Sequence, residues 1–386
     1  MTHPELHIAP VRQYRTARED AAFLRRTDRR AVRVWGRDPV RMIQGLITND
    51  IAGAPEGQGV YAAMLTPKGK MVADLRAFRV GDEVLLETDA GALDGLTDVL
   101  KRFVPPLFAR WAVIEDAGVI GVYGPAARDA IGRIELPPPP AGCAEDAFAV
   151  GAGPRDNATG TDAAGSAAGP DATLDSCIVV RTAYTGDDGY DVLARGPALD
   201  ALEEALLAAG VRRIGFDTLE VLRIEAGRPR WGAELTPDVI PLEAGLMPRA
   251  ISTSKGCYTG QEVIVRILHR GHVNWHLRGL IFDDHMVRDL DEHVDFAPGV
   301  RLRENRISDR KVGRVTSICR SPRAGKTIGL GFVRREVLPP AIVVLDVDTP
   351  ANVRVVPLPF PSADADALFT KDWPRNGGEP EEEIEV

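Results

Sequence analysis

Long hydrophobic runs are missing from this sequence, and with them the usual signals of a membrane or secreted protein. No uninterrupted apolar stretch approaches the length needed to cross a bilayer. Residues 1–7 also lack the basic flank and following apolar segment that mark a secretory signal. We therefore expect a cytoplasmic protein that has no membrane partner.

Cysteines are few and widely spaced: Cys143, Cys177, Cys257 and Cys319. No C-x-x-C pair occurs, which argues against a zinc ribbon and against a cluster site built from neighbouring residues. Such cysteine usage fits a reducing cytoplasm. The spacing leaves open that three or four of these thiols meet in space and ligate a cluster.

An excess of positive charge is also absent. The formal net charge is −9, and much of this negative excess lies in the terminal run 379–385. Non-specific electrostatic binding to polyphosphate is therefore not expected, and we predict no nucleic-acid partner. Residues 357–386 are predicted to form a solvated, disordered acidic tail.

The sequence does contain enough apolar material for two or three packed units, with 386 residues of which 44% are hydrophobic. Short strands alternate with helices in the first part, whereas after residue 284 short strands follow one another as in a small antiparallel barrel. A hairpin turn is expected at residues 66–70, and a flexible surface insertion at 137–173. Strands are expected at 60–65, 71–78, 84–88, 177–181, 190–193, 301–303, 311–317, 327–333 and 341–345, and helices at 91–103, 198–209 and 216–226.

The run 255–262, K-G-C-Y-T-G-Q-E, is the strongest motif. Its two glycines allow unusual backbone geometry and close approach of a ligand, and Lys255 is placed to favour the thiolate of Cys257. Residues 263–268 are predicted to be a buried strand that supports the loop. A lone cysteine is often a small core hydrophobe, but these polar neighbours favour a functional Cys257.

This motif resembles the signature of the YgfZ-like folate-binding proteins, relatives of the glycine-cleavage T-protein that act in iron-sulfur cluster assembly. Residues 329–334, G-L-G-F-V-R, resemble the C-terminal barrel of the same superfamily. The resemblance implies an α+β fold, a T-protein-like cloverleaf of mixed α/β folate-binding subdomains with a small C-terminal antiparallel β-barrel. It divides the chain into an N-terminal segment 1–22, a folate-binding region 23–284, a barrel 285–356 and the tail.

Residues 181–191 resemble the T-protein run whose last carboxylate binds the pterin ring, and this position is Asp191. A carboxylate suits that role because the aminopyrimidinone edge offers two adjacent N–H donors. Tyr184 lies in the same run and is assigned to the cofactor. Residues 69–75 resemble the segment that bears the catalytic aspartate of the aminomethyltransferases, which places Asp74 in that role. Without the resemblance, an acid such as Asp191 is more often a solvated residue of a strand or turn.

Several positions depart from the T-protein pattern. Ala73 replaces an acid, and Leu85 and Leu219 stand where the family has a folate-contacting tyrosine and arginine. Two nearby arginines, Arg223 and Arg228, suit a folate glutamyl carboxylate because a guanidinium binds it through two donors. The alternative for either arginine is a surface ion pair with Glu220 or Glu225.

His269, His272 and His276 follow the motif, and a metal site is one interpretation of them. Gly271 and Asn274 argue against a regular helix there, and no Cys or acidic residue completes the set. We therefore predict no metal site and favour a basic or solvated patch.

The leading functional hypothesis is an accessory protein that binds tetrahydrofolate or a one-carbon derivative and serves iron-sulfur client or cluster-assembly proteins. Cys257 would carry the chemistry, with Lys255 and Glu262 orienting it. The enzyme alternative is a folate-dependent aminomethyltransferase that uses Asp74. A third alternative is a non-catalytic folate sensor that recruits a partner.

Overall fold

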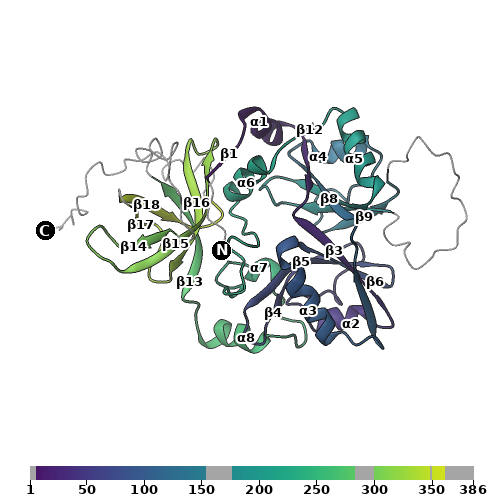
Figure 1. Ribbon diagram of the computed structural model, residues 1–386, viewed down its shortest axis with the longest axis horizontal. Helices are drawn as coiled ribbons and strands as arrows, with labels where there is room; N and C mark the ends of the chain where they lie inside the picture. The colour runs from purple at the N-terminus through teal and green to yellow at the C-terminus, as the bar shows by residue number, and fades with distance from the viewer. Residues whose placement is uncertain (1–5, 154–175, 283–299, 348–349, 361–386) are drawn as a thin grey trace, which may run out of the picture.

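The computed structural model describes residues 6–153, 176–282, 300–347 and 350–360. Its strands form three sheets, which Figure 1 shows as a barrel on the left and two sheets on the right, one above the other. Helices α6 and α7 lie between the barrel and the two other sheets. The helices are α1 (Val11–Glu19), α2 (Pro39–Gln44), α3 (Leu93–Phe103), α4 (Ala127–Arg133), α5 (Pro197–Ala208), α6 (Phe216–Glu225), α7 (Met247–Ala250) and α8 (Gln261–Arg270).

The lower sheet has the strand order β4-β5-β6-β3-β7, and all of its pairings are antiparallel. The predicted hairpin is confirmed, because the Thr66 amide donates to the Lys70 carbonyl between β4 and β5. These strands are β3 (Arg29–Gly36), β4 (Val60–Leu65), β5 (Met71–Val80), β6 (Glu83–Asp89) and β7 (Ala109–Val113).

The upper sheet has the order β12-β2-β8-β11-β10-β9. Strand β9 falls inside the predicted insertion at 137–173. This part of the insertion is ordered, because Phe148 is only 8% exposed and β9 pairs with β10. Residues 154–173 of that insertion lie outside the described ranges. The strands are β2 (Ala22–Arg26), β8 (Ala117–Tyr123), β9 (Phe148–Gly151), β10 (Cys177–Thr182), β11 (Gly189–Arg195) and β12 (Arg212–Arg213).

The third sheet is the barrel, and the α+β fold with a C-terminal antiparallel barrel is confirmed. Its strands pair in the order β15-β14-β17-β18-β13-β16, and β16 pairs back to β15, while β1 adds to β15 in parallel. Strand β13 precedes the boundary predicted at residue 285. These strands are β1 (Leu6–Ile8), β13 (Trp275–Phe282), β14 (Arg301–Arg303), β15 (Lys311–Ser321), β16 (Lys326–Arg334), β17 (Ala341–Leu345) and β18 (Ala351–Val356).

The strand predicted at 263–268 is wrong, because these residues belong to helix α8. Ile264 is buried, whereas Val265 and Leu268 are 40% and 39% exposed, so burial follows a helical rather than an alternating period. The β-branched composition suggested a strand, but packing overrides such propensities. Gly260 precedes the helix with φ +85°, and a Cβ there would lie 2.6 Å from the Thr66 carbonyl oxygen. A glycine is therefore required where α8 begins against the β4–β5 turn.

Candidate functional site

A small cavity of about 50 Å³ lies where the upper and lower sheets meet the segment that follows α6. Four of the predicted site residues line it: Asp74, Tyr184, Asp191 and Arg228. The fold thus brings together residues from β5, the β10–β11 turn, β11 and the chain after α6. The full lining is Arg26, Arg29, Tyr61, Asp74, Arg76, Glu145, Asp146, Thr182, Tyr184, Asp191, Arg228, Pro229 and Arg249.

Asp74 is 6% exposed on β5, and its Oδ2 accepts a hydrogen bond from the Tyr61 hydroxyl at 3.1 Å. Its Oδ1 is buried and has no hydrogen-bond partner within the described ranges. Burial raises the pKa of this carboxyl group, although Arg29 partly offsets the effect. A buried acceptor without a donor is costly, so the geometry suits a ligand that supplies an N–H or O–H group.

Asp191 is 3% exposed on β11, and both of its oxygens are engaged. Oδ1 accepts from the Tyr123 hydroxyl at 2.8 Å, and Oδ2 pairs with the Arg76 guanidinium at 2.8 Å. The ring of Tyr184 lies under the Arg26 guanidinium, 4.9 Å from the ring centroid. Asp191 and Tyr184, two of the four predicted cofactor residues, therefore reach the cavity, each beside an arginine.

Sequence reasoning missed most of these arginines. Arg76 lies two residues after Asp74, so strand alternation places both on one face of β5, a signal that was available in the sequence. Glu87 is fully buried and pairs with both Arg76, at 2.7 Å, and Arg29. Burial opposes the charged form of Glu87, but the two guanidinium groups outweigh it and lower its pKa. Glu87 does not itself line the cavity, but it holds two of the arginines that do.

Glu145 closes the more exposed side of the cavity. Its carboxylate bridges the Nη2 atoms of Arg228, at 3.1 Å, and Arg249, at 2.9 Å, and the three side chains are 23%, 19% and 33% exposed. Arg249 in turn lies over the Tyr61 ring, 4.8 Å from the centroid. Ligand pockets usually enclose about 300–1,000 Å³. We therefore infer that a ligand larger than one or two waters enters by moving this bridge.

Arg223 does not line the cavity. Its side chain is fully buried on α6, where it pairs with Glu220 at 2.8 Å and Glu234 at 3.1 Å and donates to Ser317 Oγ of the barrel at 2.9 Å. The ion pair with Glu220 foreseen as the alternative is present, but it is buried rather than on the surface. Arg223 therefore joins α6 to the barrel.

The motif loop lies apart from the cavity lining. Cys257 is exposed, as is Glu262 in the first turn of α8. The Nζ atom of Lys255 donates to the carbonyls of Gln44, at 2.6 Å, Ile47, at 2.6 Å, and Asn49, at 3.0 Å. These bonds take all three ammonium protons. Burial lowers the Lys255 pKa to about 8, and the ammonium holds the 44–49 segment, while the influence of Lys255 on the Cys257 thiol stays a prediction.

The other cysteines do not join Cys257. Cys177 is buried in the upper sheet and Cys319 in the barrel, while Cys143 is half-buried. Within the described ranges, no group of three His, Cys, Asp or Glu side chains is placed to hold a metal. His269, His272 and His276 are distributed over the end of α8, a loop and the start of β13.

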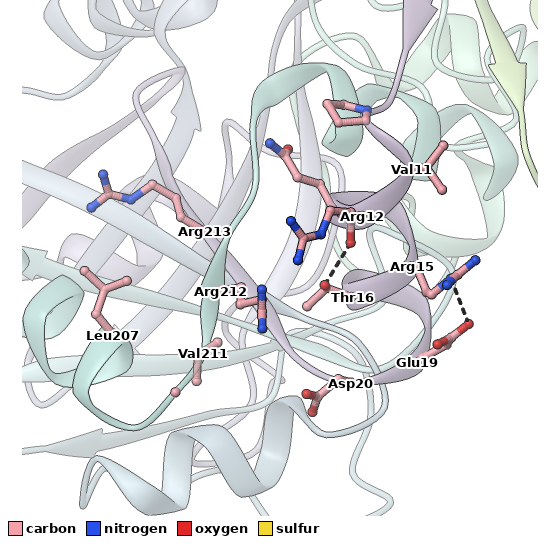
Figure 2. Close-up of a pocket in the computed structure, with 13 residues that line it drawn as sticks. Val11, Arg12, Arg15, Thr16, Glu19, Asp20, Leu207, Val211, Arg212 and Arg213 are labelled. Atoms are coloured by element: carbon pink, nitrogen blue, oxygen red, sulfur yellow. Dashed lines mark hydrogen bonds and ion pairs between the residues drawn. The ribbon is translucent and has the colours of Figure 1, made fainter.

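A larger hollow, about 980 Å³, lies on the outer side of α1 beside β12. Figure 2 shows Arg12 and Arg212 pointing into it, with Thr16 nearby and the Arg15–Glu19 pair at its side. None of the predicted site residues lines this hollow. The central cavity is therefore the better candidate for the functional site.

Two family models match the chain: the GCVT N-terminal domain over residues 4–137 and 168–255, and the glycine cleavage T-protein C-terminal barrel domain over residues 287–361. The chain is 30% identical over 330 residues to an aminomethyltransferase of Rubrobacter xylanophilus, covering 84% of this chain and 79% of that protein. It is 27% identical over 332 residues to a trimethylamine-oxide aldolase of Ruegeria pomeroyi, of which it spans only 39%.

Among solved structures, the glycine cleavage system aminomethyltransferase T of Bartonella henselae aligns with a TM-score of 0.74 at 20% identity, covering 91% of this chain and 89% of that one. At this identity the likeness speaks for the fold alone. The two family models and the 30% identical relative show that the chain belongs to the glycine cleavage T-protein family. No helix within the described ranges is long and apolar enough to span a membrane.

Proposed function

We propose that the central cavity binds tetrahydrofolate or a one-carbon derivative of it. The observation that carries this proposal is the buried Asp74 Oδ1, an acceptor with no donor within the described ranges. Asp191 and Tyr184 flank the pterin in this proposal, while Arg228 and Arg249 take the glutamyl carboxylates through their guanidinium groups. Membership of the T-protein family supports the same ligand class.

Equilibrium binding of a reduced folate tests this proposal. The wild-type chain is expected to bind with saturation, and Asp191→Ala is expected to lose binding because it also frees Arg76 inside the cavity. Asp188→Ala is a suitable control, since Asp188 is 62% exposed in the β10–β11 turn and pairs with Arg181, and neither residue lines the cavity. Absence of binding by the wild-type protein would refute the proposal.

We further propose that the bound folate serves an accessory role in the assembly or repair of iron-sulfur clusters in client enzymes, with Cys257 as the contact. The exposed position of Cys257 supports this, because the motif presents a thiol that a partner can reach. Leu85 and Leu219 also support it: both are buried in the core at 2% and 1% exposure, and neither lines the cavity. Two folate contacts of the transferases are thus replaced by core residues.

A second candidate is a folate-dependent aminomethyltransferase of the glycine cleavage type. The names of the similar proteins favour it, and so does Asp74, which stands at the position of the family's catalytic acid with a raised pKa and a Tyr61 partner. Here Asp74 would hold or deprotonate the amine.

Two assays separate the candidates. Formation of methylene-tetrahydrofolate from an aminomethyl-lipoyl donor, lost in Asp74→Asn, would establish the transferase. In cells that lack the wild-type protein, Cys257→Ser should fail to restore iron-sulfur enzyme activity, whereas Cys143→Ser should restore it. Full restoration by Cys257→Ser would refute the accessory role of the thiol.

A further inference from the structure

Asp146 is a second cavity acid that the sequence did not single out. It precedes β9, is 8% exposed and contributes to the cavity lining. Within the described ranges, no hydrogen bond or ion pair reaches its carboxylate oxygens. The residue is more than nine-tenths buried, but its oxygens are not fully buried, and since Asp146 lines the cavity they are open to a ligand that donates hydrogen bonds.

The backbone holds Asp146 in one position. Its amide donates to the Arg181 carbonyl at 2.9 Å, and its carbonyl accepts from the Gly59 amide at 2.9 Å. Its φ is +66°, a left-handed conformation that costs energy for most residues but that Asp and Asn tolerate. Backbone strain of this kind concentrates at binding sites. The carboxylate is therefore a fixed feature of the cavity wall.

The charged groups around Asp146 come from several elements. Burial raises its pKa to about 6, Arg76 on β5 and Arg249 on α7 favour the charged form, and Glu145 and Glu87 oppose it. The carboxylate is therefore ionised above neutral pH. Arg76 is already engaged by Glu87 and Asp191, and Arg249 by Glu145.

Asp191 and Asp146 are both acids of the cavity lining, but they differ in whether their oxygens already have partners. Asp191 has a partner on each oxygen, whereas Asp146 has two open oxygens. We propose that Asp146 accepts the two adjacent N–H donors of the pterin's aminopyrimidinone edge, while Asp191 holds Arg76 in place. This assignment rests on the proposed folate binding and names the residue that recognises the 2-amino group.

The test compares wild type with Asp146→Asn in equilibrium binding of 5-formyltetrahydrofolate at about pH 8. Asn keeps the left-handed backbone but replaces one acceptor oxygen by a donor. We expect binding at least about tenfold weaker, with an unfolding midpoint that is unchanged or higher, because the variant no longer buries a charge. Asp188→Asn, at the exposed turn, should leave affinity unchanged.

A ligand analogue makes the test specific. Removing the 2-amino group from the same folate should weaken binding to wild type and to Asp191→Asn, but should cost little further in Asp146→Asn, since its partner is already gone. Wild-type affinity should also fall as the pH drops through about 6, where the carboxyl gains a proton. That transition should be missing in Asp146→Asn.

The outcomes separate the two proposals. If wild type binds the folate but Asp146→Asn binds it equally well, the assignment of Asp146 is overturned and the folate site stands. The same holds if the analogue penalty in Asp146→Asn equals that in wild type, which indicates a merely structural role. If wild type does not bind the folate, both proposals fail.

Discussion

Arg223→Met removes the buried link between α6 and the barrel. The guanidinium donates to Glu220 through Nε at 2.9 Å and Nη2 at 2.8 Å, to Ser317 Oγ at 2.9 Å, to Glu234 at 3.1 Å and to the Arg228 carbonyl at 2.7 Å. Methionine retains much of the aliphatic volume but none of these donors. The substitution therefore isolates the polar contribution.

The size of the expected stability loss depends on the Glu234 charge that Arg223→Met leaves buried. Glu234 is 0% exposed and keeps hydrogen bonds from Thr316, Ser317 and the Arg230 amide, all of which are neutral donors. Removing one partner of a buried ion pair costs about 3–5 kcal/mol because the other charge stays buried. A protein of this kind has about 5–15 kcal/mol of stability in total. We expect Arg223→Met to lose about 3–5 kcal/mol in the free energy of unfolding.

Urea denaturation measures this loss, and Arg230→Met is the matched control. Arg230 donates to Glu220 at 3.0 Å but is 36% exposed, and Glu220 keeps Arg223 when Arg230 is removed. The control should lose about 1 kcal/mol or less. Adding Glu234→Gln to Arg223→Met should restore part of the stability, since it removes the stranded charge. Equal losses in the two single variants would refute the reasoning.

Three further outcomes are expected. Glu145→Gln should tighten reduced-folate binding by about fivefold, because it frees the two bridged guanidinium groups for ligand carboxylates. Weaker binding in titration calorimetry would contradict the proposal that the ligand enters by moving this bridge. An alkylating reagent should modify Cys257 rapidly and Cys319 only on unfolding, and Cys257→Ser should lose the fast phase. Burial opposes the charged form of Glu220, but Arg223 and Arg230 lower its pKa to about 2. This shift contributes about 3 kcal/mol to the free energy of unfolding at pH values above the pKa of the unfolded state. That contribution should be lost as the pH falls from about 4.5 to 2. Acid titrations of the unfolding free energy should show a smaller loss in Glu220→Gln.

Local signals in the sequence predicted the hairpin of β4 and β5, helices α3, α5 and α6 and most barrel strands. These elements carry their own turn residues or apolar period, so packing only confirms them. Helix α8 was mistaken for a strand because its β-branched residues favour strands, while the burial that decides the question comes from the β4–β5 turn. Strands β13 and β18 were not singled out at all.

Some residues of the candidate site were predicted from the sequence and others were missed. Asp74 and Asp191 were found through family resemblance, Arg228 was proposed because a guanidinium suits a carboxylate, and all three line one cavity. Glu145 and Asp146 were missed because they lie in a stretch read as a flexible insertion. Their position just before Phe148 was an available signal. A large aromatic side chain in a segment of small and polar residues is expected to be buried, and Phe148 is.

A continuous path of contacts gives the lysine of the motif a role that its spacing from Cys257 did not suggest. Lys255 binds the Asn49 carbonyl, and the Asn49 side chain donates to the Arg249 carbonyl at 3.1 Å. Arg249 in turn binds Glu145 at the exposed side of the cavity. The cation therefore fixes the segment that positions a cavity arginine, while the thiol two residues later faces solvent. One loop thus connects the proposed folate pocket to the proposed partner surface, which gives a structural role to a charged and buried lysine beside an exposed cysteine.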